Sequence, residues 1–150
     1  MSRILITREH AEPLASRLAE AGLESIHIPL IRLVGTDAPP PEGRPDAVLV
    51  TSPAAPRFAQ GMADKVSRAR VVAVGGATAE ALKGVGVNPR DVGDAGGIAA
   101  LDMLQPDPET VCWYIGAETP SPDLDAAMDA SGIVRWAVYR NEPAGVDASA

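Results

Sequence analysis

The chain has 150 residues, which is enough for one ordinary domain with a hydrophobic core. Hydrophobic residues make up 46% of it and aromatic residues only 3%, so the expected core consists of Val, Ile, Leu and Ala. The formal net charge of -7 argues against nucleic-acid binding, which needs a basic patch, and against binding to an anionic membrane. The single cysteine, Cys112, excludes a disulfide within the chain and a cysteine-rich zinc site, so we expect a reducing, cytoplasmic setting.

The first third of the chain predicts one strand–helix–strand unit. The opening MSRILITREH has a short apolar run followed by charges, so residues 3–7 predict a first strand rather than a signal peptide. Residues 13–21 predict a helix, and residues 25–34 predict a strand that Pro29 interrupts. Residues 35–46, GTDAPPPEGRPD, predict a stiff, proline-rich linker and a domain boundary.

After the linker the alternation of strands and helices continues. The expected strands are 47–50, 71–74, 87–92, 111–115 and 133–139, and the expected helices follow Ser52 or cover 78–83, 97–104 and 122–131. Ser52 and Ser121 are the expected N-caps of their helices, each with a proline at the first helical position. Residues 141–150 are expected to form a frayed tail.

This alternation predicts an α/β fold, an open parallel sheet with helices on both faces. Residues 47–140 carry the patterns of about five strands, which suits a flavodoxin-like lobe. The unit 1–34 is then left over. Three partners are expected for this unit: a second lobe that the sequence lacks, another copy of the chain, or the edge of the sheet.

The carboxyl ends of the expected strands indicate where a ligand binds, because open α/β sheets bind ligands there. These ends are Thr7-Arg8, Thr51-Ser52, the turn 75–78, the segment 116–118 and Tyr139-Arg140. Several precede a helix N-terminus, where unpaired N–H groups carry about half a positive charge. A rim of small residues can therefore bind carboxylates or phosphates without many basic side chains. The alternative is that small residues occur there only because the turns are tight.

Standard catalytic motifs are absent from the sequence. There is no phosphate-binding G-x-x-x-x-G-K-[ST] loop, no G-x-G-x-x-G that opens the first helix, and no metal-ligand spacing. His10 and His27 are expected to be ordinary surface or core residues, and Cys112 a small buried hydrophobe. The segment Thr7-Arg8-Glu9 lacks the acidic pair of a magnesium-binding receiver domain.

The last strand holds two large aromatic side chains. Regular alternation places Trp136 on one face, in the core, and Arg135, Ala137 and Tyr139 on the other face. Tyr139 ends the strand. Its hydroxyl therefore either faces a ligand or packs against the protein.

Four segments resemble uroporphyrinogen-III synthases, in the order that this family has them. They are ILITRE with LASRLAEAGLESIHIPLIRL, then DAVLVTSPAAPRFA, VAVGGATAEALKGVGV, and PDLDAAMDASGIVRWAVYRNEP. The third is similar to the family pattern Val-Gly-x-x-Thr-Ala-x-x-Leu-x-x-x-Gly. Together the matches cover most of the chain up to Pro143.

The resemblance implies an enzyme of tetrapyrrole and heme biosynthesis, with two α/β lobes and a cleft between them. Such an enzyme closes the linear hydroxymethylbilane into uroporphyrinogen III, inverts ring D and releases water. The resemblance further implies that no metal or cofactor is needed, and that a monomer binds the substrate carboxylates largely through backbone amides. Catalysis then comes from confining and orienting a reactive substrate.

The resemblance also assigns roles to residues. Tyr139 matches a tyrosine that assists departure of the hydroxyl as a general acid, and Thr78 matches a threonine beside the cleft. The substrate-binding candidates are Arg8, Thr51, Ser52, Gly75, Gly76 and Ala77.

Three departures from the family pattern separate the competing hypotheses. An Asn that usually follows the Thr-Ser turn is replaced by PAAP, and an Arg-Gly pair is replaced by the segment YIGAE. The sequence also stops before the second half of the first lobe, which predicts a truncated or divergent member that self-associates or has an incomplete cleft. The second hypothesis is a non-catalytic synthase-like module that binds a tetrapyrrole or another anionic ligand. The third is a flavodoxin-like or receiver-like signalling domain.

Overall fold

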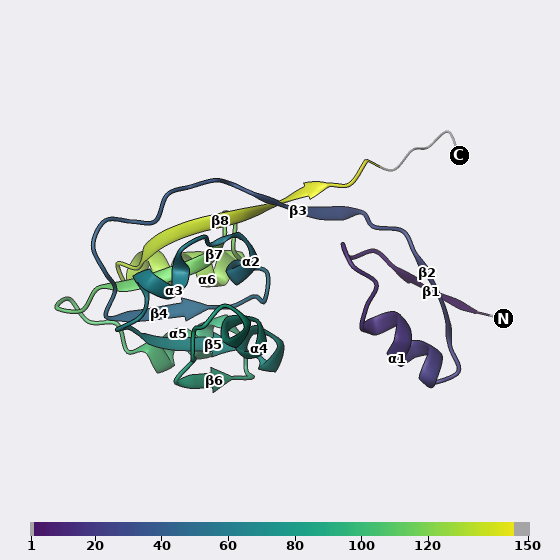
Figure 1. Cartoon of the computed structure of the whole chain (residues 1–150), viewed down its shortest axis with the longest axis horizontal. Helices are drawn as coiled ribbons and strands as arrows, with labels where there is room; N and C mark the ends of the chain where they lie inside the picture. The colour runs from purple at the N-terminus through teal and green to yellow at the C-terminus, as the bar shows by residue number, and fades with distance from the viewer. Residues whose placement is uncertain (1, 146–150) are drawn as a thin grey trace. The chain divides into compact units, whose positions relative to one another are not determined.

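The computed structural model describes residues 2–145, and these form two compact units (Figure 1). The smaller unit contains residues 2–34 and 141–145, and the larger unit is Gly35–Arg140. Within residues 2–145 no helix is long and apolar enough to cross a membrane. The frayed tail expected from residue 141 is wrong for residues 141–143, because the last strand continues to Pro143, and residues 146–150 lie outside the described residues.

The smaller unit is a strand–helix–strand unit, as the sequence predicts. Strands β1 (Arg3–Ile6) and β2 (Glu24–His27) pair in parallel, and helix α1 (Leu14–Glu20) connects them. Strand β3 (Ile31–Gly35) follows β2, so the interrupted strand expected around Pro29 is two strands. A proline has no N–H to donate to a ladder and therefore ends β2 before β3 begins.

The larger unit is built on five strands of a six-stranded sheet with the order β3-β8-β7-β4-β5-β6, in which the edge strand β3 belongs mostly to the smaller unit. Its further strands are β4 (Ala47–Val50), β5 (Arg70–Val74), β6 (Asp91–Gly93), β7 (Cys112–Ala117) and β8 (Val134–Pro143). The neighbouring pairs from β8 to β6 are all parallel. The mainly parallel α/β fold predicted from the sequence is therefore confirmed.

The strand order of this sheet differs from that of flavodoxin. Counted from β4 along the chain, the order is 5-4-1-2-3, so the first strand lies at the centre and the chain winds outward in both directions. Flavodoxin itself has the order 2-1-3-4-5, whereas 3-2-1-4-5 is the order of doubly wound dinucleotide-binding sheets. Periodicity indicates that strands are present, but it does not say which strands are neighbours.

Helices cover both faces of the sheet. They are α2 (Ala55–Phe58), α3 (Met62–Lys65), α4 (Gly76–Gly84), α5 (Gly97–Leu104) and α6 (Pro122–Ala130). Helices α5 and α6 pack on the face that carries Leu49, Val72 and Tyr114. The chain passes through α2, α3 and α4 as it moves toward β6, and through α5 and α6 as it moves toward β8. Right-handed crossovers in these two opposite directions place α2, α3 and α4 on the face of the sheet opposite to α5 and α6.

The helix expected directly after Ser52 begins later and is interrupted. Helix α2 has its N-cap at Ala54, and the Ser52 hydroxyl instead accepts a hydrogen bond from the Ala54 N–H at 3.2 Å. Gly61, with φ of 75°, then separates α2 from α3. Left-handed backbone at a glycine cannot continue a right-handed helix.

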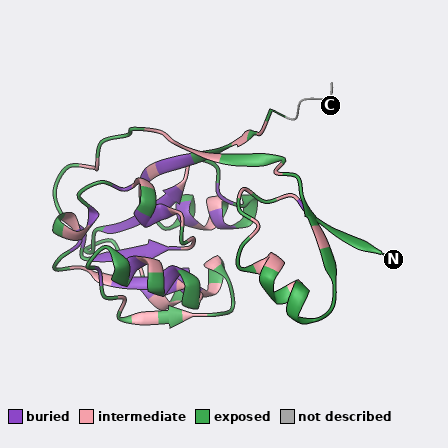
Figure 2. Ribbon diagram, turned by 45° about the vertical axis from the view of Figure 1, so that its right-hand side comes forward, coloured by how far each residue is buried: buried purple, intermediate pink, exposed green. Residues whose placement is uncertain are grey.

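The central strands of the larger unit supply most of its buried core residues (Figure 2). All four residues of β4 are buried, as expected for a strand with helices on both faces. The core is less purely aliphatic than the composition predicts, because Trp113 and Tyr114 are its largest fully buried side chains. Trp113 meets Trp136 edge to face at a centroid distance of 6.3 Å, which confirms Trp136 as a core residue.

Candidate active site

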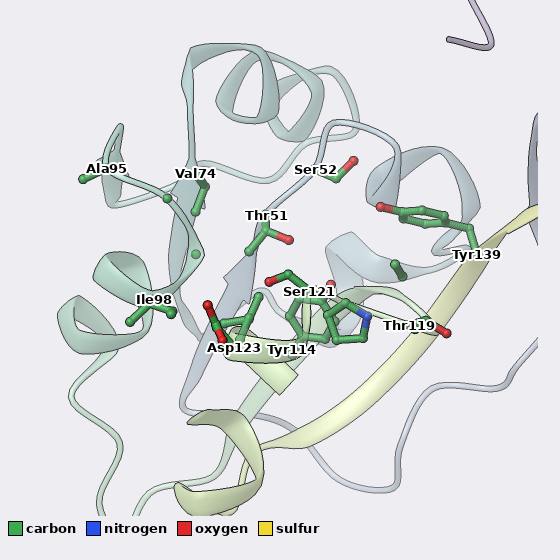
Figure 3. A pocket seen from close by; sticks show the side chains of 15 residues that line it. Thr51, Ser52, Val74, Ala95, Ile98, Tyr114, Thr119, Ser121, Asp123 and Tyr139 are labelled. Carbon is green, nitrogen blue, oxygen red and sulfur yellow. The ribbon is translucent and has the colours of Figure 1, made fainter. Parts of the chain in front are cut away.

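The sheet of the larger unit has a topological switch point between β4 and β7. From β4 the chain moves outward to β5 and β6, and it then returns to β7 and β8 on the other side of β4. The loops after β4 and β7 therefore diverge, and doubly wound sheets bind ligands in the crevice that this divergence opens. A cavity of about 510 Å³ lies at this position, with walls from the carboxyl ends of β4 and β7 and from Tyr139 of β8 (Figure 3).

Two helix N-termini contribute to the cavity wall. Gly96, Gly97 and Ile98 come from the start of α5, while Ser121 and Asp123 come from the start of α6. Neither helix has a side-chain hydrogen bond at its N-cap. Their first N–H groups therefore give this wall a partial positive charge that favours anions.

Gly97 allows these elements to approach closely. A Cβ atom at this position would lie 3.0 Å from Cδ2 of Leu124 and 3.5 Å from Cγ2 of Thr51. The absence of a side chain therefore brings α5 against α6 and the end of β4. The sequence predicts α5 correctly, but the N-terminus of this helix was not predicted to be part of the site. The signal was the Gly96-Gly97 pair that opens the helix.

Thr51 and Ser52 lie where the sequence predicts them. They follow β4 directly, both line the cavity, and both are half-buried. Figure 3 shows both side chains at the cavity wall, together with Tyr139 from β8. The structure thus brings three of the candidate residues to one cavity, although their contact with a substrate stays a prediction.

A β-bulge determines the direction of Tyr139. The register pairs Gly116 with Ala137 but Ala117 with Tyr139, so Val138 is an extra residue on β8. A bulge of this kind breaks the regular alternation of side chains and re-aims the next one. Tyr139 is 7% exposed and lines the cavity.

The prediction that Arg135 and Tyr139 share a face of β8 is therefore wrong. Arg135 contacts α6, where its Nη2 atom donates to Asp129 Oδ1 at 2.8 Å. Tyr139 instead packs against Phe58 of α2, with a centroid distance of 5.8 Å. Phe58 lines a surface groove together with Trp136, which is on the face opposite to Arg135.

Tyr114 is a second tyrosine in the cavity wall, and it was not among the residues predicted from the sequence. It lies inside β7 and is 2% exposed. Burial raises the pKa of the Tyr114 phenol above its ordinary value of 10.0, and interactions with the Thr51 side chain and the Ala117 backbone lower it in part.

The raised pKa of Tyr114 predicts a loss of stability at alkaline pH. Below pH 10.0 the phenol is protonated in both the folded and the unfolded chain, so its contribution is complete. As the pH rises further, the unfolded chain releases the proton first, and the free energy of unfolding falls through the folded-state pKa. Thermal unfolding over an alkaline pH series should show this fall, and the fall should be smaller in Tyr114→Phe.

Tyrosinate absorbance provides the matching control. The chain has two tyrosines, so a Tyr139→Phe variant reports Tyr114 alone. Its phenol should titrate above pH 10.0 while the protein is folded. Titration at or below that value in the folded protein would contradict the burial of the hydroxyl.

The turn that follows β5 lies beside the cavity lining rather than in it. Val74 lines the cavity, whereas Gly75, Gly76, Ala77 and Thr78 are not among the lining residues. Gly75 uses its N–H to donate to the Gly93 carbonyl oxygen at 2.6 Å. Thr78 is 2% exposed within the first turn of α4. The binding and catalytic roles that the resemblance gives to these four residues stay predictions.

Arg8 belongs to the smaller unit, where its carbonyl oxygen meets Nε2 of His27 at 2.8 Å. Its predicted role as a carboxylate partner also stays a prediction. His10 and His27 are both exposed. Among residues 2–145 no group of three or more His, Cys, Asp or Glu side chains is placed to hold a metal ion.

The charge of the cavity differs from that of a typical anion site. Asp123 is the only charged residue among those that line it. Its carboxylate is exposed in the first turn of α6, where the helix dipole stabilises a negative charge. An anionic ligand would therefore depend on the backbone N–H groups and on the hydroxyls of Thr51, Ser52 and the two tyrosines.

Residues 35–140 form a doubly wound α/β unit with a cavity at its switch point, the position at which proteins of this class bind ligands. Solved structures share this fold. A mutant uroporphyrinogen III synthase from Thermus thermophilus has a TM-score of 0.68 at 22% identity, covering 96% of this chain and 64% of that one. A uroporphyrinogen-III synthetase from Helicobacter pylori has a TM-score of 0.60 at 16% identity, covering 99% and 65%. No match was found among the curated proteins.

The chain belongs to the uroporphyrinogen-III synthase family. The family model described as uroporphyrinogen-III synthase HemD matches residues 12–150. The chain spans about two thirds of the length of the synthase structures that it matches, 64% of the first and 65% of the other.

Proposed function

We propose that the cavity is part of a uroporphyrinogen-III synthase site that binds hydroxymethylbilane and promotes its closure to uroporphyrinogen III, with inversion of ring D and release of water. The observation that carries the proposal is the convergence of Thr51, Ser52 and Tyr139 on one cavity in a chain of this family. The N-termini of α5 and α6 supply the N–H groups that a polycarboxylate needs.

The residues of the cavity divide the task between binding and proton transfer. Substrate carboxylates accept hydrogen bonds from the first N–H groups of α5 and α6 and from the Thr51 and Ser52 hydroxyls. The terminal C–O bond of the substrate breaks as the Tyr139 phenol donates its proton, so that the hydroxyl leaves as water, and the phenolate regains a proton from the pyrrole carbon that loses its hydrogen when the ring closes. Holding the chain ends of the substrate near each other then favours ring closure. No cofactor takes part in this proposal.

Isomer analysis tests the proposed function. The protein, alone or as a self-associated oligomer, is expected to convert freshly prepared hydroxymethylbilane to the type III isomer. The same assay run with size-exclusion chromatography assigns the activity to a monomer or an oligomer. Formation of only the spontaneous type I isomer would contradict the proposed function.

A second candidate is a non-catalytic module that binds a tetrapyrrole or another anionic ligand. It is favoured by the lack of any basic side chain among the residues that line the cavity, and by the YIGAE segment that stands in place of the Arg-Gly pair. Tight binding of a porphyrin without ring closure would select this candidate over the synthase.

A further inference from the structure

The geometry points to Tyr114 as a ligand-binding residue: its hydroxyl, in a cavity wall shared with Thr51 and Ala117, donates a hydrogen bond to a carboxylate oxygen of the tetrapyrrole in the cavity. This assignment rests on the proposed binding of a tetrapyrrole, but not on turnover. It gives the site a second phenol with a role different from that of Tyr139.

The position of Tyr114 is fixed by the core. Its ring belongs to the buried cluster that includes Leu124, Met128 and Ala100, so only the hydroxyl end reaches the cavity wall. A rigid aromatic ring loses little conformational entropy when its polar end binds a ligand. Figure 3 shows Tyr114 among the lining residues, below Thr51 in that view.

Gly116 makes the room for this arrangement. Residues 114 and 116 point to the same side of β7, and a Cβ atom at position 116 would lie 2.5 Å from the Tyr114 hydroxyl oxygen and 2.6 Å from Cζ. The phenol therefore lies along the strand, over the glycine, toward its carboxyl end. This direction brings the hydroxyl to the same edge of the sheet as the ligand cavity.

The interactions of the phenol leave it a donor. The Thr51 side chain and the Ala117 backbone both lower the pKa of the phenol, so they act on its oxygen as an acceptor, and the phenol proton remains to donate to a ligand in the cavity. The raised pKa supports this role, because a phenol that stays protonated is a constant donor to an anion and a poor proton-transfer acid. A neutral donor also adds no charge to a partly buried wall.

Binding of uroporphyrin I, a porphyrin with eight carboxylates, tests the assignment without requiring turnover. Tyr114→Phe keeps the ring and removes the hydroxyl, and we expect its Kd for uroporphyrin I to rise roughly 10-fold or more. The loss should be of binding rather than of rate, so KM for hydroxymethylbilane should rise while kcat changes little. Ser131→Ala removes a hydroxyl outside the cavity and should change neither value.

A double-mutant cycle separates a ligand contact from a merely structural role. Thr51→Val should weaken binding as well, and Tyr114→Phe should cost less in the Thr51→Val background than in the wild type, because the two side chains line one cavity and interact. Thr110→Val, at an exposed threonine outside the cavity, is the matched control. If Tyr114→Phe does not fold, the Kd of the Thr51→Val variant for uroporphyrin I still tests the interaction of Thr51 with the wild-type tyrosine.

The outcomes distinguish this assignment from the proposed function. If the wild type binds uroporphyrin I but forms no type III product, the synthase proposal is contradicted. The Tyr114 assignment is then tested by the affinities of the variants alone. Unchanged affinity in a folded Tyr114→Phe protein, or strictly additive effects in the cycle, would overturn the assignment. Absence of uroporphyrin I binding by the wild type would overturn it as well.

Discussion

Tyr139→Phe is expected to slow formation of the type III isomer about 100-fold or more, with little change in stability. A positioned general acid contributes roughly 10²- to 10⁴-fold to a rate, and phenylalanine removes the acidic proton while it keeps the ring. The contact with Phe58, at a centroid distance of 5.8 Å, should survive the substitution. Measurement of kcat for hydroxymethylbilane closure, with the isomers separated chromatographically, checks this result.

The controls for Tyr139→Phe separate proton transfer from binding and folding. Uroporphyrin I should bind the variant about as well as the wild type if the phenol acts mainly in the transition state. Ser131→Ala should retain the wild-type rate, because Ser131 hydrogen-bonds only near the end of α6, to the Ala127 carbonyl oxygen at 3.0 Å. A wild-type rate in a folded Tyr139→Phe protein would remove the general-acid role from this residue.

Much of the site could be predicted because its residues occupy the ends of strands. The apolar run before Thr51 shows where β4 ends. The run before Tyr139 predicts a strand end that is wrong, because β8 continues to Pro143, but Tyr139 pairs with Ala117, the last residue of β7. Parallel strands bring their carboxyl ends to one edge, so local patterns are enough to place Thr51, Ser52 and Tyr139 together. Helix α5 was likewise predicted at its observed bounds, Gly97–Leu104.

The remaining features depend on interactions between distant segments. The strand order and the bulge opposite Ala117 arise from pairing, which no local pattern records. The bulge in particular turns Tyr139 away from the side of Arg135 that simple alternation predicts. Sequence patterns assign a residue to a strand, but the neighbouring strand decides where its side chain points after an irregularity.

Tyr114 was missed for a different reason. It stands in the middle of an apolar strand, and its ring is indeed a core residue. Only its length carries the hydroxyl to the end of the strand, and only the glycine two residues later leaves that path open. The sequence Tyr-Ile-Gly therefore held a usable signal, a tyrosine followed on the same face by a residue without a side chain.

Gly116→Ala is expected to destabilise the larger unit by about 2 kcal/mol and to weaken the binding of uroporphyrin I. The new Cβ atom would lie 2.5 Å from the Tyr114 hydroxyl oxygen and 2.6 Å from Cζ, so the phenol or the strand must shift. Overpacking of this kind in a buried position costs roughly 1–3 kcal/mol. Chemical denaturation gives the change in the free energy of unfolding, and titration with uroporphyrin I gives the change in affinity.

The cost of Gly116→Ala should depend on the phenol itself. In a Tyr114→Leu background the clashing atoms are absent, so the same substitution should cost much less than in the wild type. Gly84→Ala is the matched control, because nothing lies within 4 Å of its Cβ position and it ends helix α4. That change should be neutral or slightly stabilising, since alanine favours a helix by up to about 1 kcal/mol over glycine. Equal costs of Gly116→Ala in both backgrounds would mean that Gly116 is required by the strand and not by the tyrosine, and the path of the hydroxyl to the cavity would lose its explanation.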